Sequence, residues 1–368
     1  MKVGIITFQE TNNYGAVLQN YALQQAILQR GYSVETIDYR STYIGKPYRL
    51  SHLRKKGLFA YLFGVLGYLI YLPRTGKCRK FRQMIYYSRP VDMNSIGELN
   101  NEYDIFITGS DQVWNHKLTG MDTTYMLDFV TDKSKCNSFA ASVGLSEIEN
   151  SEKEQYCSLL KDYGHITVRE KSASSLMENV LSRHIQIVSD PCLMLTKEKW
   201  GTVAIEPENS QKYVFVYQLG VSPDIVKLAR RIAKKESLDL VFVPFPVGAF
   251  APGKWDICAG NAELIGYIKN AEYVVTDSFH GTLLSIIFNK KFFTKISGTH
   301  AGVGSRIYDL LEHYGVTNRI IHENIDFEQV ISYDIINEKL EKDRKNAFLE
   351  LDKILHVAES DMNLFSSN

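Results

Sequence analysis

The stretch EYVVTDSFHGTLLSII (272–287) joins two patterns that together decide the fold class. EYVVT (272–276) is short and rich in β-branched residues, as expected of a buried strand. The run LLSII (283–287) is apolar and fits a helix. His280 and Gly281 stand at the junction, where a strand would end and a helix would begin. Strand–helix alternation of this kind predicts an α/β domain with a parallel sheet.

The same alternation runs through the rest of the chain. VGIITF (3–8), a helical pattern over 16–30 and SVETIDY (33–39) form a strand–helix–strand opening. Further strands are predicted at 104–111, 137–144, 165–170, 185–190, 213–220, 238–245 and 291–297. Helical patterns lie between them, at 151–163, 170–181, 223–235, 262–270 and 305–315. The chain is therefore predicted to be α/β, with two Rossmann-like domains facing a cleft.

A polar stretch at 196–212 interrupts the alternation and is the predicted hinge. It separates an N-terminal domain (1–200) from a C-terminal domain (201–335), which is followed by helices at 336–368. In open α/β sheets ligands bind beyond the carboxyl ends of the strands. Residues at those ends are therefore the first candidates for a site.

Composition indicates a globular protein of a reducing compartment. Of the 368 residues, 45% are hydrophobic, which is enough for two cores. The five cysteines are scattered and include no CxxC pair, which argues against a disulfide framework or a zinc site. MKVGIITF (1–8) already has the pattern of a core strand, so we expect no signal peptide and a cytoplasmic location. We expect no metal, no cofactor and no nucleic-acid partner.

Charge is segregated along the chain although the net charge is zero. Between Asp38 and Asp92 there are twelve basic residues and no acidic one. Within this interval, residues 57–72 carry no charge and are mostly apolar or aromatic. A helix of that length spans about 24 Å, less than the roughly 30 Å hydrocarbon core of a bilayer.

This pattern favours an insert at about 41–90 that docks on an anionic membrane surface without crossing it. The predicted membrane-contacting residues are Arg54, Lys55, Lys56, Leu58, Phe59, Leu62, Phe63 and Leu66. The alternative is a buried core or interface helix with solvated basic loops.

His280 follows a predicted strand and opens a predicted helix. The backbone N–H groups of Gly281 and Thr282 would be unpaired there, and the helix dipole would add partial positive charge. Such an end favours an anion such as phosphate or carboxylate. Gly281 would let a ligand approach closely, and Ser278 or Asp277 would cap the helix. The alternative is an ordinary capped turn with an incidental histidine.

Two arginines are candidates for gripping an anion. Arg169 ends the predicted strand HITV, and its guanidinium can fork onto a carboxylate or a phosphate. A surface ion pair with Glu170 is the alternative. Arg306 begins a helix after a glycine-containing loop, with Ser305 as its expected N-cap. A solvent-facing arginine in the first turn is equally consistent with this pattern.

Two further strand-end loops, TNNYGAV (11–17) and ITGSDQVWN (107–115), contain amides, a carboxylate and an indole, groups that bind sugars. The candidate acceptor-binding residues are Asn12, Asn13, Tyr14, Ser110, Asp111 and Trp114. Neither loop contains GxGxxG or GxxxxGK(S/T), so dinucleotide binding and Walker-type phosphate binding are disfavoured. Each loop alone would also fit a simple turn.

Several segments together resemble the polysaccharide pyruvyl transferase family. They are MKVGIITFQETNNYGAVLQNYALQ (1–24), ITGSDQVWN (107–115), TVREKSA (167–173), VSDPCLML (188–195), TDSFHGTL (276–283) and SRIYDLL (305–311). The resemblance covers roughly residues 3–315. Its specificity comes from the combination in this order, since each piece alone is common.

The resemblance implies a GT-B-like pair of Rossmann domains, with the acceptor bound by the first and the donor by the second. It also implies transfer of pyruvate from phosphoenolpyruvate, as co-substrate, onto two hydroxyls of a sugar, with formation of a cyclic ketal and release of phosphate. Catalytic roles fall to Arg169 and His280. Donor binding falls to Arg169, Ser278, His280, Gly281, Thr282, Ser305 and Arg306.

The expected acceptor is a galactose-containing glycan on a polyprenyl diphosphate, as in bacterial capsule or exopolysaccharide synthesis. Such units are assembled at the inner face of the cytoplasmic membrane, which would explain a membrane-docking insert and a peripheral location. An oligomer is compatible with the sequence. Two alternatives remain open. One is a GT-B glycosyltransferase or nucleotide-sugar epimerase, and the other is a non-catalytic, membrane-associated assembly factor.

Overall fold

The computed structural model consists of two compact units. Unit 1 comprises Met1–Ile70, Arg82–Met194 and Lys342–Asn368, and unit 2 comprises Tyr71–Phe81 and Leu195–Glu341. The structure describes residues 1–9, 11, 13–41, 43–44, 72–145, 147–208, 211–244, 253–296, 303–323 and 325–356.

These units divide the chain differently from the predicted domains. The division near the middle falls between Met194 and Leu195, a few residues before the predicted hinge. Residues 72–82 are helical, and all but the last belong to unit 2, although they lie inside the predicted N-terminal insert. The long C-terminal helix α12 (Tyr333–Ile354) begins in unit 2 and ends in unit 1, so residues 336–354 continue one helix that starts before the predicted boundary.

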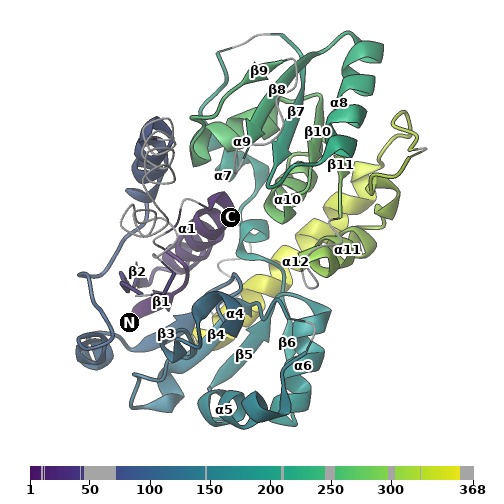
Figure 1. Cartoon of the computed structure of the whole chain (residues 1–368). Helices are drawn as coiled ribbons and strands as arrows, with labels where there is room; N and C mark the ends of the chain where they lie inside the picture. The colour runs from purple at the N-terminus through teal and green to yellow at the C-terminus, as the bar shows by residue number, and fades with distance from the viewer. Residues whose placement is uncertain are drawn as a thin grey trace, which may run out of the picture. The chain divides into compact units, whose positions relative to one another are not determined.

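Unit 1 contains a parallel sheet of six strands in the order β2-β1-β3-β4-β5-β6 (Figure 1). Its strands are β1 (Lys2–Ile6), β2 (Ser33–Thr36), β3 (Ile105–Thr108), β4 (Cys136–Ala141), β5 (His165–Val168) and β6 (Gln186–Ile187). Its main helices are α1 (Tyr14–Gln29), α4 (His116–Thr119), α5 (Asn150–Leu160) and α6 (Lys171–Leu181). Its 3-10 helices are Ile96–Asn101, Thr123–Met126, Lys133–Lys135 and Pro191–Met194.

Successive strand residues point to opposite faces, and unit 1 buries both faces of its sheet. Val3 and Ile5 of β1 pack in a cluster with residues of α1 and the second half of α12. Ile6 belongs to the cluster on the other face, with residues of α5 and α6. The return of α12 to unit 1 is fixed by Arg30, which donates two buried hydrogen bonds to Asp352, at 2.6 and 3.1 Å.

Unit 2 contains a parallel sheet of five strands in the order β11-β10-β7-β8-β9 (Figure 1). Its strands are β7 (Tyr213–Gln218), β8 (Asp239–Pro244), β9 (Lys254–Trp255), β10 (Tyr273–Thr276) and β11 (Lys291–Thr294). Its helices are α7 (Lys197–Thr202), α8 (Pro223–Glu236), α9 (Asn261–Asn270), α10 (Phe279–Ile287) and α11 (Val303–Tyr314), with a 3-10 turn at Thr317–Arg319.

Strand β7 shows how the faces of the unit 2 sheet are covered. Val214 and Val216 pack with the apolar side of α8. The alternate residue Phe215 stacks on Tyr267 of α9, with ring centroids 5.4 Å apart. Tyr217 points to the same side as Phe215 and lies against Gly281 of α10. Helices therefore cover both faces, as parallel sheets require.

Each sheet reverses its strand order at one point, and the carboxyl ends of the strands there form the usual ligand crevice of open α/β sheets. In unit 1 the reversal lies between β1 and β3. In unit 2 it lies between β7 and β10. The predicted α/β class with two parallel sheets is confirmed. Among the residues that the structure describes, no helix is both long and apolar enough to cross a bilayer.

Candidate functional site

The motif that opened the sequence analysis lies at the strand reversal of unit 2. Ser278 follows β10 and caps α10, since its hydroxyl accepts a hydrogen bond from the Gly281 N–H at 3.2 Å. The Thr282 N–H binds the Ser278 carbonyl at 2.9 Å. The predicted anion contacts of Gly281 and Thr282 through these N–H groups are therefore not available, because Ser278 already occupies both. His280 stands in the first turn, partly exposed.

Gly281 is needed for packing rather than for ligand approach. A Cβ at this position would lie 2.7 Å from the Thr276 hydroxyl oxygen and 2.9 Å from a ring carbon of Tyr217. Helix α10 thus rests directly on β10 and β7. This close contact holds the first turn of α10, and with it His280, at the ends of these two strands.

Arg306 is brought to the same place by α11. Its guanidinium lies 5.8 Å from the ring centroid of Phe279, and the arginine is 7% exposed. The Phe279 ring in turn contacts the His280 ring edge-on, with centroids 5.2 Å apart. Helix α11 begins at Val303, so Ser305 lies within its first turn and is not the predicted N-cap. The structure thus gathers Ser278, His280 and Arg306.

Arg74 is a second arginine whose charge acts near this group, and it was not among the predicted site residues. Arg74 lies on the helix over residues 72–82, which packs on unit 2 through an ion pair of Lys77 with Glu263 at 3.1 Å. Arg74 is only 3% exposed. Burial raises the pKa of the Tyr217 hydroxyl, while a hydrogen bond with Ser278 and the charge of Arg74 oppose that rise. The charge of Arg74 therefore acts on a hydroxyl that bonds the cap residue Ser278.

Asp277 holds the loop that follows β7. Its carboxylate accepts hydrogen bonds from the backbone N–H groups of Leu219, at 2.7 Å, and Gly220, at 3.3 Å. Burial raises the pKa of Asp277, although these N–H groups act in the opposite direction. Asp277 therefore ties the end of β10 to the loop after β7, and Ser278 is the helix cap.

Arg169 lies at the carboxyl end of β5 in unit 1, as predicted, but it is buried among acidic side chains. Its guanidinium lies 2.6 Å from Asp190 and 3.6 Å from Glu170, and it donates to the Ser110 hydroxyl at 3.1 Å. All three partners are buried. Burial would lower the pKa of Arg169, but the negative charges of Asp190, Glu170 and Asp111 raise it overall.

This environment argues against the predicted grip of Arg169 on an anionic donor. Three carboxylates act on one guanidinium, so a further anion would meet net negative charge. Each carboxylate is also held by other groups. Asp190 accepts from the Cys192 N–H at 2.9 Å, and Glu170 accepts from the Ser142 hydroxyl at 2.7 Å. This environment favours a role for Arg169 in ordering the acidic cluster, while donor binding by Arg169 stays a prediction.

The two predicted acceptor loops flank the strand reversal of unit 1. Asn13 is the N-cap of α1, since its side chain accepts from the Gly15 N–H at 3.0 Å. Tyr14 is buried, and Asn12 lies outside the described residues. Ser110 donates a hydrogen bond of 3.3 Å to Asp190, which links this loop to the acidic cluster.

Asp111 is partly exposed beyond the end of β3, whereas Trp114 is fully buried. Asp111 has a backbone φ of +93°, which is unusual for a residue other than glycine, and strained positions of this kind are concentrated at functional sites. Trp114 has no exposed surface and packs in the core with Tyr163. A buried indole offers no face to a sugar, so the prediction for Trp114 is wrong and the residue belongs to the core.

The predicted membrane contacts Arg54, Lys55, Lys56, Leu58, Phe59, Leu62, Phe63 and Leu66 all lie outside the described residues. The basic segment that follows them is described. Arg74 and Lys77 face unit 2, and Arg82 donates to the Thr11 carbonyl at 3.2 Å. Arg79 and Lys80 are exposed. Only part of that basic flank is therefore directed to solvent.

Comparison with known proteins gives one family and several solved structures. A family model described as polysaccharide pyruvyl transferase matches residues 13–295. A search of curated protein sequences found no match.

Three solved structures illustrate the similarity. UDP-N-acetylglucosamine 2-epimerase from Rickettsia bellii has a TM-score of 0.49 and 10% identity, over 99% of this chain and 97% of that one. UDP-GlcNAc 2-epimerase from Methanocaldococcus jannaschii has a TM-score of 0.47 and 14% identity, over 97% and 100%. The E. coli heptosyltransferase WaaC has a TM-score of 0.40 and 12% identity, over 93% and 99%.

Proposed function

Because the chain belongs to the polysaccharide pyruvyl transferase family, we propose that it transfers pyruvate from phosphoenolpyruvate to two hydroxyls of a sugar. In this reaction C2 of the donor forms bonds to two sugar oxygens, and its bond to the phosphate oxygen breaks. The methylene carbon takes up a proton and becomes a methyl group. The two hydroxyl protons balance this uptake and the charge on the departing phosphate.

The observation that carries this proposal is the group of side chains at the strand reversal of unit 2. Arg306 and the first turn of α10 with His280 lie together there, and the buried Arg74 acts through its charge on Tyr217, whose hydroxyl bonds Ser278. Guanidinium groups bind carboxylates and phosphates through paired hydrogen bonds, and a helix N-terminus adds favourable potential. Phosphoenolpyruvate carries both anionic groups. We assign the donor to this group, with the Ser278 hydroxyl at its edge.

The acidic cluster of unit 1 suits the acceptor better than the donor. Carboxylates accept hydrogen bonds from sugar hydroxyls and draw off their protons. Asp111, Ser110 and Asn13 lie at the strand reversal of this unit, and Asp111 is partly exposed there. Arg169 forms ion pairs with Asp190 and Glu170 and so holds them in place. We assign the sugar to this edge.

His280 is the proposed proton donor or acceptor. An imidazole can exchange a proton near neutral pH, which the methylene protonation and the hydroxyl attack both need. Its first-turn position keeps it beside the assigned donor groups Arg306 and Ser278.

Release of phosphate from phosphoenolpyruvate tests the proposed function directly. Purified protein would be incubated with the donor and a panel of lipid-linked acceptors containing galactose, glucose or mannosamine. We expect acceptor-dependent phosphate release and a product heavier by one pyruvate ketal. Thermal protection by a uridine nucleotide, with none by phosphoenolpyruvate and no phosphate release, would instead favour a nucleotide-sugar enzyme.

Arg74→Gln tests the donor assignment. We expect the affinity for phosphoenolpyruvate, measured by calorimetry, to fall roughly tenfold to a hundredfold, as for loss of one charged hydrogen bond. Lys80→Gln is the matched control because Lys80 lies on the same helix and is exposed. Equal donor affinities of the two variants would remove Arg74 from the site.

A peripheral membrane location, with a polyprenyl-linked galactose-containing acceptor, is part of the proposal. It rests on the basic and apolar sequence at 53–72. Replacement of Arg54, Lys55 and Lys56 by Gln should weaken co-sedimentation with anionic liposomes, by about 1 kcal/mol per residue and most strongly at low salt. The control replaces Lys199, Lys227 and Lys234, three exposed lysines of unit 2. Unchanged sedimentation of the first variant would contradict membrane docking.

A further inference from the structure

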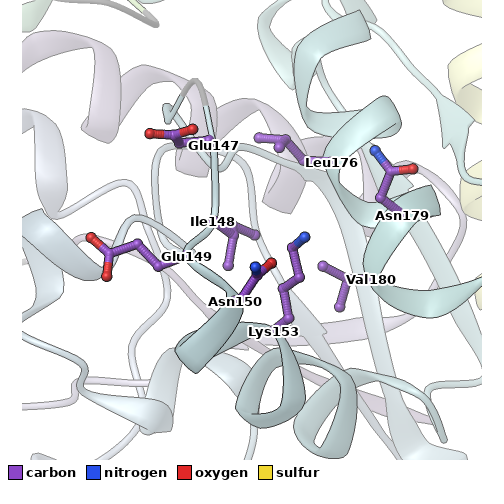
Figure 2. Close-up of a pocket in the computed structure, with 8 residues that line it drawn as sticks. All are labelled: Glu147, Ile148, Glu149, Asn150, Lys153, Leu176, Asn179 and Val180. Atoms are coloured by element: carbon purple, nitrogen blue, oxygen red, sulfur yellow. The ribbon is translucent and has the colours of Figure 1, made fainter.

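Unit 1 contains a cavity whose lining does not include the acidic cluster. It has a volume of about 440 Å³ and lies between the loop that follows β4, the first turns of α5 and the side of α6 (Figure 2). The same loop starts at Ser142, whose hydroxyl binds Glu170 at 2.7 Å. One continuous segment therefore links the cavity to the cluster around Arg169. Its size falls within the range of about 300–1,000 Å³ that is usual for small-molecule sites.

The floor of this cavity is aliphatic and fixed. Ile148 is 4% exposed and belongs to the core of unit 1. Leu176 and Val180 are one turn apart on α6, so they share a face, and both pack against the same core. Because the core holds all three side chains, the floor is formed before any ligand arrives.

The rim of the cavity is polar. In the part of the chain that the structure describes, none of these side chains makes a hydrogen bond or an ion pair with another residue: Glu147, Glu149, Asn150, Lys153 and Asn179.

Glu149 and Lys153 illustrate this best. They are four residues apart at the start of α5, a spacing at which such charges often pair. In Figure 2 the Lys153 side chain extends between Asn150 and Val180, whereas the Glu149 carboxylate points away from these three residues. The rim therefore keeps acceptors and donors of hydrogen bonds available around an aliphatic floor.

We propose that this cavity is a saccharide-binding subsite that takes one neutral hexose unit. The amide oxygens of Asn150 and Asn179 would accept hydrogen bonds from hydroxyls, while the Lys153 ammonium and the amide nitrogens would donate. The floor would contact the carbon-bound hydrogens of the ring. Two carboxylates against one ammonium disfavour a phosphate, and the lining contains no aromatic ring on which a base could stack.

This subsite rests on the proposed function for the identity of its natural ligand, a sugar unit of the acceptor glycan. It would hold a unit other than the one that receives the pyruvate, because none of the assigned reacting groups lines the cavity. Loss of the subsite should therefore raise the KM for an oligosaccharide acceptor and leave kcat unchanged.

The test uses the full chain and saturation-transfer NMR with methyl galactoside, methyl glucoside and lactose. Inorganic phosphate is the anion probe, and its binding is measured by calorimetry because it has no carbon-bound protons. We expect saturation transfer to at least one saccharide. Lys153→Met and Asn179→Ala should each weaken its binding about tenfold. Glu154→Gln, an exposed residue of α5 outside the cavity lining, should leave binding unchanged.

The outcomes separate the subsite from the reaction. Saccharide binding that depends on Lys153, in a protein that never releases phosphate from phosphoenolpyruvate, would keep the subsite and reject the proposed function. Phosphate release with saccharide binding equal in wild type, Lys153→Met and Asn179→Ala would reject the subsite and keep the function. Binding of inorganic phosphate that requires Lys153, with no saccharide bound, would also overturn the subsite.

Discussion

His280→Gln is expected to leave both units folded and to reduce pyruvyl transfer by roughly 10²- to 10⁴-fold, the usual contribution of a general acid or base. Glutamine has a similar size and can hydrogen-bond, but it cannot exchange a proton. The side chain stands in the first turn of α10, on the Phe279 ring that Arg306 also approaches. The measurement is acceptor-dependent phosphate release under saturating donor.

The matched control for this variant is His322→Gln, because His322 is exposed elsewhere in unit 2. Calorimetric donor affinity should change little in His280→Gln, since the arginines remain. Turnover close to wild type in a folded His280→Gln protein would exclude the histidine from the proton transfer. Loss of donor binding with normal turnover at saturation would make it a binding residue only.

The strands and their ends could be predicted because each buried strand is encoded by a short run of neighbouring residues. A buried strand such as β10 appears as a short apolar run, and the chain places polar residues directly after it. His280 and Arg169 were both selected for this reason, and both lie at carboxyl strand ends. The short strand β9 was missed because its two residues, Lys254 and Trp255, carry no periodicity.

Partners that come from distant parts of the chain could not be predicted. Nothing near Arg169 in the sequence indicates that Asp190 would lie 2.6 Å from its guanidinium. The only indication in the sequence is the VSDP segment, in which an acidic residue is the last of a predicted strand. Arg74 was counted with the membrane flank because its neighbours are basic, whereas the structure places its helix in unit 2.

Local polarity also misled the interpretation of Trp114. Its neighbours in GSDQVWNH are mostly polar, which suggests an exposed loop. The core position of Trp114 is set instead by Tyr156, whose hydroxyl donates to the Trp114 carbonyl at 2.6 Å, and by the Tyr163 ring. Both contacts come from residues more than forty positions away along the chain. A pattern read over a few residues does not contain this information.

Arg169→Met is expected to destabilise unit 1 by about 3–5 kcal/mol, the usual cost of removing one partner from a buried ion pair. Methionine replaces the apolar stem of the arginine but not its guanidinium, so the loss is chiefly one of charge and hydrogen bonds. It would leave Asp190 and Glu170 buried without their cation, and Ser110 without its donor. Thermal unfolding followed by circular dichroism, with urea unfolding as the second probe, measures the change.

Two further variants separate this structural role from donor binding. Asp190→Asn should reduce the additional cost of Arg169→Met, because the charge that the arginine neutralises is already removed. Arg169→Lys should fall between wild type and Arg169→Met, since an ammonium keeps the charge but not the planar fork. At a temperature where Arg169→Lys is folded, its affinity for phosphoenolpyruvate should equal that of wild type. An unchanged melting temperature together with a lost donor affinity would return Arg169 to the donor site and remove it from the acidic cluster's support.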